Sequence, residues 1–208
     1  MTQNHDGQVR SILSDETLSM LLTTTEGEAL CVLMLGFDGS GTQDAFRDET
    51  GFDPTPELTT YLDVQISIAI AKLIDAGKKH FFVVLKDGVT ASMAHGCARI
   101  RDDASDPRKP VLWVVAGTDK LSSCTASEEK AMREADRVIA IREFDEERIT
   151  DELVCGCGAI LSVYAHPENV PTLEGAAMAD MELINLNPAE ILKAYHEQKQ
   201  RGDNPAPR

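Results

Sequence analysis

The most constraining feature of the chain lies in residues 138–187, where short apolar runs alternate with segments of helical pattern. RVIAI is followed by a polar helical pattern, AILSVYA by a proline-containing loop, and the small-residue segment TLEGAAMAD by ELINL. Continuous apolar runs of this length are typical of strands that are covered on both faces. Their alternation with helices predicts the second half of a parallel, doubly wound α/β sheet.

The preceding part of the chain continues this alternation, with further strands expected at ALCVLML, HFFVVLK and VLWVVAG. We expect helices over residues 62–76, 90–103, 146–155 and 172–179, another from Ser127, and a last one that starts at Pro188 with Asn187 as its cap. With right-handed crossovers, these elements predict a Rossmann-like α/β fold. Its sheet is doubly wound and mostly parallel, with helices on both faces.

The N-terminal segment gives two further expectations. Apolar residues at positions 9, 12, 13 and 20 have the spacing of a short helix. Two apolar runs around Glu26 and Gly27, in residues 21–35, predict a hairpin that adds an antiparallel edge to the sheet. We expect a single α/β domain over residues 1–208, with mobile ends at 1–7 and 203–208.

Composition restricts the partners. The formal net charge of -15 repels nucleic-acid backbones and anionic membranes, so we expect binding to neither. The chain shows no signal-peptide pattern and no apolar run of membrane length, which predicts a soluble cytoplasmic protein.

The five cysteines are unevenly spaced and do not form a disulfide framework. Cys155 and Cys157 are separated by one residue but have no companions at ligand spacing, so we expect no metal site. His95 and Cys97 lie in a small-residue helix, where packing is a better interpretation than a catalytic pair.

Candidate ligand-binding residues follow the predicted strands, because the binding crevice of such a sheet lies at the carboxyl ends of its strands. Each set also has an alternative interpretation as an ordinary exposed turn. The candidates are Gly36, Asp38, Gly39 and Ser40 after the first central strand, Asp87 and Gly88 after the second, Gly117 and Thr118 after the third, and His166 on a later loop.

The order of segments resembles the Smf/DprA–LOG (SLOG) superfamily of Rossmann-like proteins. The resemblance covers residues 63–188 and rests on the succession FFVVLKDG, a small-residue helix, PVLWVVAG, SEEKAMREADRVIAI, CGAILSVYA, PTLEGAAMAD and MELINLNP. It implies a nucleotide-binding crevice at the carboxyl ends of the strands.

One branch of this superfamily, the cytokinin-activating phosphoribohydrolases, carries Pro-Gly-Gly, one spacer and Gly-Thr-x-x-Glu at the crevice. Here Thr172 takes the threonine place, but Val170 and Pro171 replace the glycine pair. The glutamate position is Gly175, with Glu174 one residue short. Pro171 has no N–H for a phosphate, whereas the Thr172 hydroxyl and the helix N-terminus supply donors. The resemblance therefore implies weak anion binding at Thr172, with Glu174 as the one candidate catalytic residue.

We therefore expect a protein that binds a nucleotide-like or phosphorylated small molecule without a cofactor, and whether it also catalyses a reaction stays open. One alternative is a nucleoside 5′-monophosphate phosphoribohydrolase, an N-glycosidase centred on Glu174 and Thr172. The other is a non-enzymatic interaction protein whose acidic surface selects its partners. Exposed apolar helices often pair in this fold, which leaves a homo-oligomer open.

Overall fold

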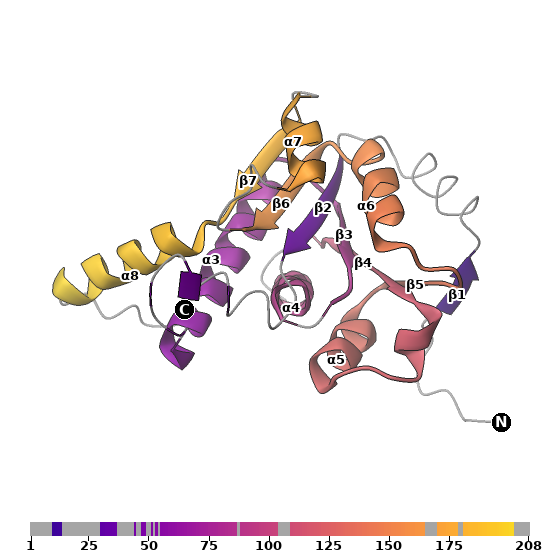
Figure 1. The fold of residues 1–208 in the computed structure, drawn as a ribbon, viewed down its shortest axis with the longest axis horizontal. Coiled ribbons are helices and arrows are strands. Elements are labelled where there is room, and N and C mark those ends of the chain that lie inside the picture. The colour runs from indigo at the N-terminus through magenta and orange to yellow at the C-terminus, as the bar shows by residue number, and fades with distance from the viewer. Residues whose placement is uncertain are drawn as a thin grey trace.

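The computed structural model describes residues 10–13, 30–36, 44, 47–48, 51, 53, 55–86, 88–103, 109–164, 170–178 and 181–201. Its centre is a seven-stranded sheet in the order β1-β5-β4-β3-β2-β6-β7 (Figure 1). Every pair of neighbouring strands is parallel. The strands are β1 (Arg10–Leu13), β2 (Cys31–Gly36), β3 (His80–Val84), β4 (Val111–Gly117), β5 (Arg137–Ile141), β6 (Ala159–Val163) and β7 (Glu182–Asn185).

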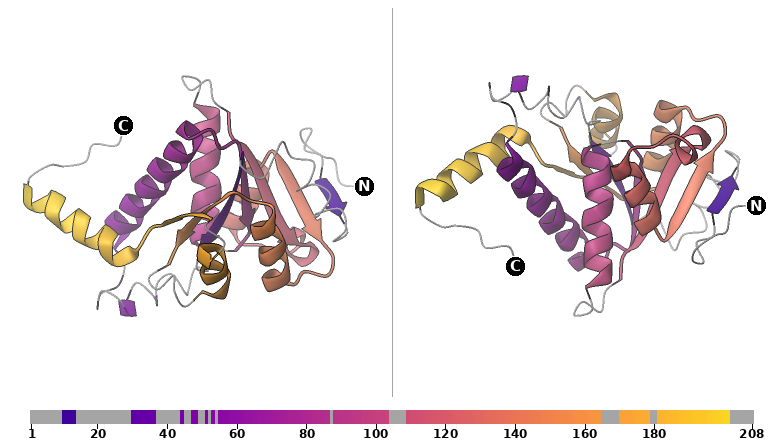
Figure 2. Two further views of the ribbon diagram at one scale, coloured as in Figure 1. Left: turned by 90° about the horizontal axis from the view of Figure 1, so that it is seen from above. Right: turned by 90° about the horizontal axis from the view of Figure 1, so that it is seen from below.

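Helices connect the strands and cover both faces of the sheet (Figure 2). They are α3 (Pro56–Asp75), α4 (Val89–Asp102), α5 (Ala126–Glu134), α6 (Glu146–Cys155), α7 (Pro171–Met178) and α8 (Pro188–Arg201), with a short 3-10 helix, η2 (Thr118–Leu121), after β4. The strands at FFVVL, VLWVV and RVIAI are direct neighbours, and β2 separates them from the strand at AILSV.

Alternate residues of the central strands enter two separate apolar cores. On β2, Val32 and Met34 pack into a core with residues of α3, α4 and α5. Cys31 and Leu33 enter the opposite core, to which α6 and α7 contribute. The continuous apolar runs are therefore buried on both faces, which confirms the predicted doubly wound α/β fold.

Local capping determines where several helices begin. Helix α3 starts at Pro56, six residues before the expected start at 62, because the Thr55 hydroxyl accepts a hydrogen bond from the Leu58 N–H. At α5, the side chains of Thr125 and Glu128 form a reciprocal capping box. Pro188 opens α8, as expected from its sequence.

The structure describes parts of the N-terminal segment for which the sequence predicted a short helix and a hairpin. The short helix predicted around Ile12 and Leu13 is wrong, because Arg10–Leu13 forms β1, which pairs in parallel with β5. The first arm of the predicted hairpin, and the ends at 1–7 and 203–208, lie outside the described residues. Its second arm contains β2, which lies between β3 and β6 and is parallel to both.

Candidate functional site

The sheet reverses its winding direction between β2 and β6. From β2 the chain proceeds outward through β3, β4 and β5, whereas β6 and β7 lie on the other side of β2. Gly36 at the end of β2 pairs with Val163 at the end of β6. In open α/β sheets, ligands bind at the carboxyl ends of strands next to such a switch point.

A cavity of about 300 Å³ lies at this switch point, and we name it the switch-point cavity. Its walls include Leu35 and Gly36 of β2, Val84 of β3 and Tyr164 just after β6. Lys86, Val170 just before α7, and residues from the first two turns of α4, α6 and α7 complete the described part of the wall. The site therefore combines three strand ends with three helix N-termini.

The N-terminus of α4 is held close to β2. Gly88 precedes the helix with φ 85°, a backbone conformation that glycine adopts without strain. A Cβ atom on Gly36 would lie 2.6 Å from Val89 Cγ1, so the missing side chain at Gly36 lets α4 approach the strand end. The Thr90 hydroxyl donates to the Lys86 carbonyl at 2.7 Å and accepts from the Lys86 N–H at 2.9 Å, which fixes the β3–α4 connection.

The three helix N-termini differ in their electrostatics. Helix α4 has neither a side-chain cap nor an acidic residue in its first turn. Helix α6 is capped by Asp145 and begins with Glu146 and Glu147, and α7 has Glu174 in its first turn. Because the positive end of the helix dipole is offset by a nearby carboxylate, α4 offers the most favourable N-terminus for an anion.

Lys86 is the one cation among the described residues that line the cavity. Its ammonium group forms an ion pair with Glu146 of α6. Burial, with a smaller contribution from the Glu146 charge, raises the pKa of Tyr164 to about 12. The Lys86, Glu146 and Tyr164 side chains therefore place a cation, an anion and a protonated phenol around one small volume.

Thr172 lines the cavity, as the sequence predicted for a crevice residue, but it already has a partner there. Its hydroxyl donates to Asp151 of α6 at 3.3 Å. The N–H groups of Leu173 and Glu174 donate to the Val170 carbonyl, at 2.9 and 3.0 Å. Helix α7 therefore has few free donors at its first turn, and Pro171 contributes none.

The remaining predicted residues divide into three groups. Gly36 lines the cavity, and Gly88 is the N-cap residue of α4. Glu174 is exposed and is not among the described residues that line the cavity, and neither are Gly117 and Thr118. The others lie outside the described residues: Asp38, Gly39, Ser40, Asp87 and His166.

Sequence reasoning did not select Lys86, Glu146 or Tyr164. The signal for Lys86 and Tyr164 was available, because each is a polar residue at the end of a predicted strand, HFFVVLK for Lys86 and AILSVYA for Tyr164. Glu146 had no comparable signal, since it belongs to an acidic segment of the kind that usually forms a solvated helix face.

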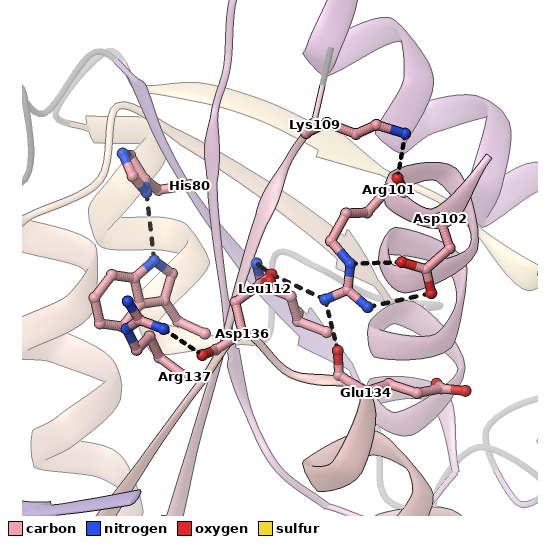
Figure 3. Close-up of polar contacts among 9 residues, drawn as sticks. His80, Arg101, Asp102, Lys109, Leu112, Glu134, Asp136 and Arg137 are labelled. Atoms are coloured by element: carbon pink, nitrogen blue, oxygen red, sulfur yellow. Dashed lines mark hydrogen bonds and ion pairs between the residues drawn. The ribbon is translucent and has the colours of Figure 1, made fainter. Parts of the chain in front are cut away.

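Far from the cavity, a polar network holds the opposite end of α4 (Figure 3). The Arg101 guanidinium donates to the Glu134 carbonyl at 2.7 Å and to Asp136 at 2.9 Å. The same Asp136 oxygen accepts the Leu112 N–H at 2.8 Å. These bonds attach the last turn of α4 to the start of β4 and to the connection between α5 and β5, which fixes the helix that points its N-terminus at the cavity.

A second cavity, of about 760 Å³, is a polar trough formed by residues of α3, α4 and α5. In this second cavity, the Nδ1 atom of His95 lies 2.6 Å from the Oε2 atom of Glu134, and the Arg99 guanidinium donates to the Ser67 hydroxyl at 2.5 Å. His95 thus forms a contact between helices rather than the packing contact expected from sequence. Cys97 is fully buried, as expected, and burial raises its pKa to about 12.

The described residues contain no cluster of three His, Cys, Asp or Glu side chains placed to hold a metal ion. In the same part of the chain, every helix is too short or too polar to span a lipid bilayer. Comparison with models of known protein families gives no match, and comparison with curated proteins gives no significant match.

Proposed function

We propose that this protein binds a nucleotide-like or phosphorylated small molecule in the switch-point cavity. One observation carries the proposal: an uncapped helix N-terminus, that of α4, and the cationic side chain of Lys86 meet at a cavity beside the β2–β6 switch point. Backbone N–H groups, the helix dipole and an ammonium group together favour an anion. The SLOG resemblance of the sequence is consistent with the same ligand class.

Lys86 is paired with Glu146, so an anion that binds to Lys86 must compete with that carboxylate. The Lys86 and Glu146 side chains are 29% and 47% exposed. An ion pair at this exposure contributes about 0–1 kcal/mol, which a phosphate with two negative charges readily offsets. The pair therefore weakens ligand binding without preventing it.

The anion is assigned to α4 rather than to α7, the helix that sequence reasoning favoured. At α7, the Thr172 hydroxyl is bonded to Asp151 and Glu174 adds a carboxylate to the first turn. At α4, the first turn contains no carboxylate. Of the two helices, α4 therefore offers a phosphate the stronger positive potential.

Isothermal titration with inorganic phosphate, ribose 5-phosphate and the common nucleoside 5′-monophosphates tests the proposal. Lys86→Ala should raise the Kd of the best probe by about tenfold or more, because a hydrogen bond to a charged group contributes roughly 1.5–3 kcal/mol. Glu146→Gln should lower the Kd, since it removes the competing carboxylate. Thr172→Ala should change the Kd less than Lys86→Ala does.

Lys72→Ala is the matched control, because Lys72 lies in the last turn of α3, away from the described residues that line the cavity. It should leave the Kd unchanged. Absence of binding by every probe at millimolar concentration would refute the proposal. Equal effects of the Lys86 and Lys72 variants would show that binding reflects charge alone and not the cavity.

The placement of Glu174 favours binding without N-glycosidic hydrolysis. Glu174 is exposed on α7, and among the described residues the carboxylates that line the cavity are those of Glu146 and Glu147. Incubation of each bound nucleotide with the protein should therefore release no free base. Release of base that is lost in Glu174→Gln would instead support the phosphoribohydrolase alternative.

A further inference from the structure

The side chain of Asn185 forms two hydrogen bonds with the backbone of Tyr164. Its Oδ1 atom accepts the Tyr164 N–H at 3.1 Å, and its Nδ2 atom donates to the Tyr164 carbonyl at 2.9 Å. The Ser162 hydroxyl donates to the same Oδ1 atom at 2.8 Å. The two donors on one side and the acceptor on the other determine the orientation of the amide. We name these three residues the Asn185 clamp.

The Asn185 clamp lies at the carboxyl end of β6, where the pairing of β6 with its neighbouring strands ends. The last residue pair between β6 and β7 joins Ser162 to Asn185, and the last pair between β6 and β2 joins Val163 to Gly36. Tyr164 comes after both pairs. The Asn185 amide therefore provides at Tyr164 the donor and acceptor that a neighbouring strand would provide. Ser162, which is fully buried, holds that amide in place through the hydrogen bond from its hydroxyl.

We infer that Asn185 is a positioning residue, which holds Tyr164 at the wall of the switch-point cavity so that the flat ring of a bound nucleotide base stacks on the tyrosine. This inference rests on the proposed function, and it narrows the ligand class from phosphorylated small molecules to those that carry an aromatic base.

The residues that line the cavity support a ligand with two parts, an anion that lies near Lys86 and a base that lies near Tyr164. Lys86, Glu146 and Tyr164 all line the switch-point cavity, and Glu146 forms an ion pair with Lys86 there. An anion at Lys86 and the α4 N-terminus leaves the Tyr164 wall for the remainder of the ligand. An aromatic side chain favours a planar base there, because stacking strengthens binding whatever the base.

Fluorine NMR of protein labelled with 3-fluorotyrosine separates positioning from ligand binding. The chain has three tyrosines, so three signals are expected, and Tyr164→Phe assigns the relevant one. Asn185→Leu removes all three hydrogen bonds of the clamp, and Asn185→Asp replaces the donor that faces the Tyr164 carbonyl. Both should move the Tyr164 signal toward that of the free amino acid. Tyr61 and Tyr195, whose ring centroids lie 5.6 Å apart between α3 and α8, should keep their signals.

Asn187→Ala is the matched control. Asn187 caps α8 by accepting the Ala189 N–H at 2.9 Å, so its loss lowers stability without touching the clamp. A purely structural role of Asn185 would make the two asparagine variants alike. We expect instead that Asn185→Asp, but not Asn187→Ala, raises the Kd of a nucleoside monophosphate about tenfold and leaves that of ribose 5-phosphate unchanged. Ser162→Ala should shift the Tyr164 signal less than Asn185→Asp does.

Three results would overturn the inference. An unmoved Tyr164 signal in folded Asn185→Asp would show that the clamp does not position the ring. A displaced signal with unchanged nucleotide affinity would show that the ring does not bind the base. Equal losses of affinity for nucleotide and for ribose 5-phosphate would show a general effect on the cavity. Failure of wild-type protein to bind any probe refutes the proposed function and with it the stacking, while the ligand-free spectra still decide whether Asn185 positions Tyr164.

Discussion

Replacing Gly36 by alanine tests whether the close approach of α4 to β2 depends on the missing side chain. The new Cβ atom would lie 2.6 Å from Val89 Cγ1 and 3.2 Å from Val89 Cβ, whereas ordinary contact begins at 3.4 Å. Gly36 is buried and Val89 is 4% exposed, so the valine side chain has no solvent into which to move. The helix start must shift or the valine must leave its rotamer.

The cost follows from two opposing effects. Overpacking of a filled core destabilises by about 1–3 kcal/mol. Alanine in place of glycine in a strand recovers roughly 0.5–1 kcal/mol, because the unfolded chain loses less conformational freedom. From the middle values of these two ranges, we expect Gly36→Ala to lower the free energy of unfolding by about 1 kcal/mol.

Gly175→Ala is the matched control, because a Cβ atom on Gly175 has no neighbour within 4 Å. In helix α7 this change should raise the free energy of unfolding by about 0.5–1 kcal/mol. Urea denaturation followed by the fluorescence of Trp113, the single tryptophan, measures both. Its ring stacks on Phe82 with centroids 5.4 Å apart, so its emission reports on the sheet.

A double-mutant cycle identifies the clashing partner. In a Val89→Ala background the atom nearest to the new methyl group is gone, so Gly36→Ala should cost about 1 kcal/mol less than in wild type. A Gly36→Ala protein as stable as wild type, or an equal cost in both backgrounds, would refute the steric explanation.

Three further measurements follow from the same structure. Asp136→Ala should lower the free energy of unfolding by about 2–3 kcal/mol, because it leaves the Leu112 N–H without this acceptor. Asp102 is an exposed ion-pair partner of Arg101, so Asp102→Ala should cost less than about 1 kcal/mol. The urea midpoints of the two variants measure this difference, and equal losses of stability would contradict the prediction. Burial raises the pKa of Cys97 from 9.0 to about 12 and also raises that of Cys157. As pH rises, the unfolded chain therefore releases these thiol protons at a lower pH than the folded chain does, so the free energy of unfolding should fall above pH 9. The fall should be less steep in Cys97→Ala. A urea midpoint that does not change between pH 8 and 10 in reducing buffer would disprove the prediction. Because the net charge is -15, labelled duplex and single-stranded DNA should show no anisotropy change at physiological salt, and micromolar binding would count against the expectation.

Much of the fold could be predicted because burial leaves a local pattern. Phe81 and Phe82 are consecutive and both fully buried, as is typical of a strand covered on two faces, and the apolar run in which they lie predicted that strand. The cap at Asn187 and the start at Pro188 are likewise local chemistry. By contrast, the four residues of β1 are too few for periodicity to distinguish a strand from a helix, and pairing with β5 decides their conformation.

The candidate site was predictable in position but not in chemistry. Sequence placed it at the carboxyl ends of the strands and selected Gly36, Gly88 and Thr172, which lie at or beside the cavity. The resemblance to the SLOG superfamily assigned the anion to Thr172, which takes the threonine place of the motif at the start of a helix. Only the folded chain brings Asp151 of α6 against that hydroxyl.

The amino-acid sequence by itself determined most of the elements of this protein, since hydrophobic periodicity and capping act between residues that are close along the chain. The tertiary structure decided the order of the strands and the pairing of charges. Lys86 and Glu146 are 60 positions apart, and Tyr164 and Asn185 are 21 apart. Such partners meet because crossover helices return the chain to one sheet edge, and nothing in the local pattern of either residue specifies the other.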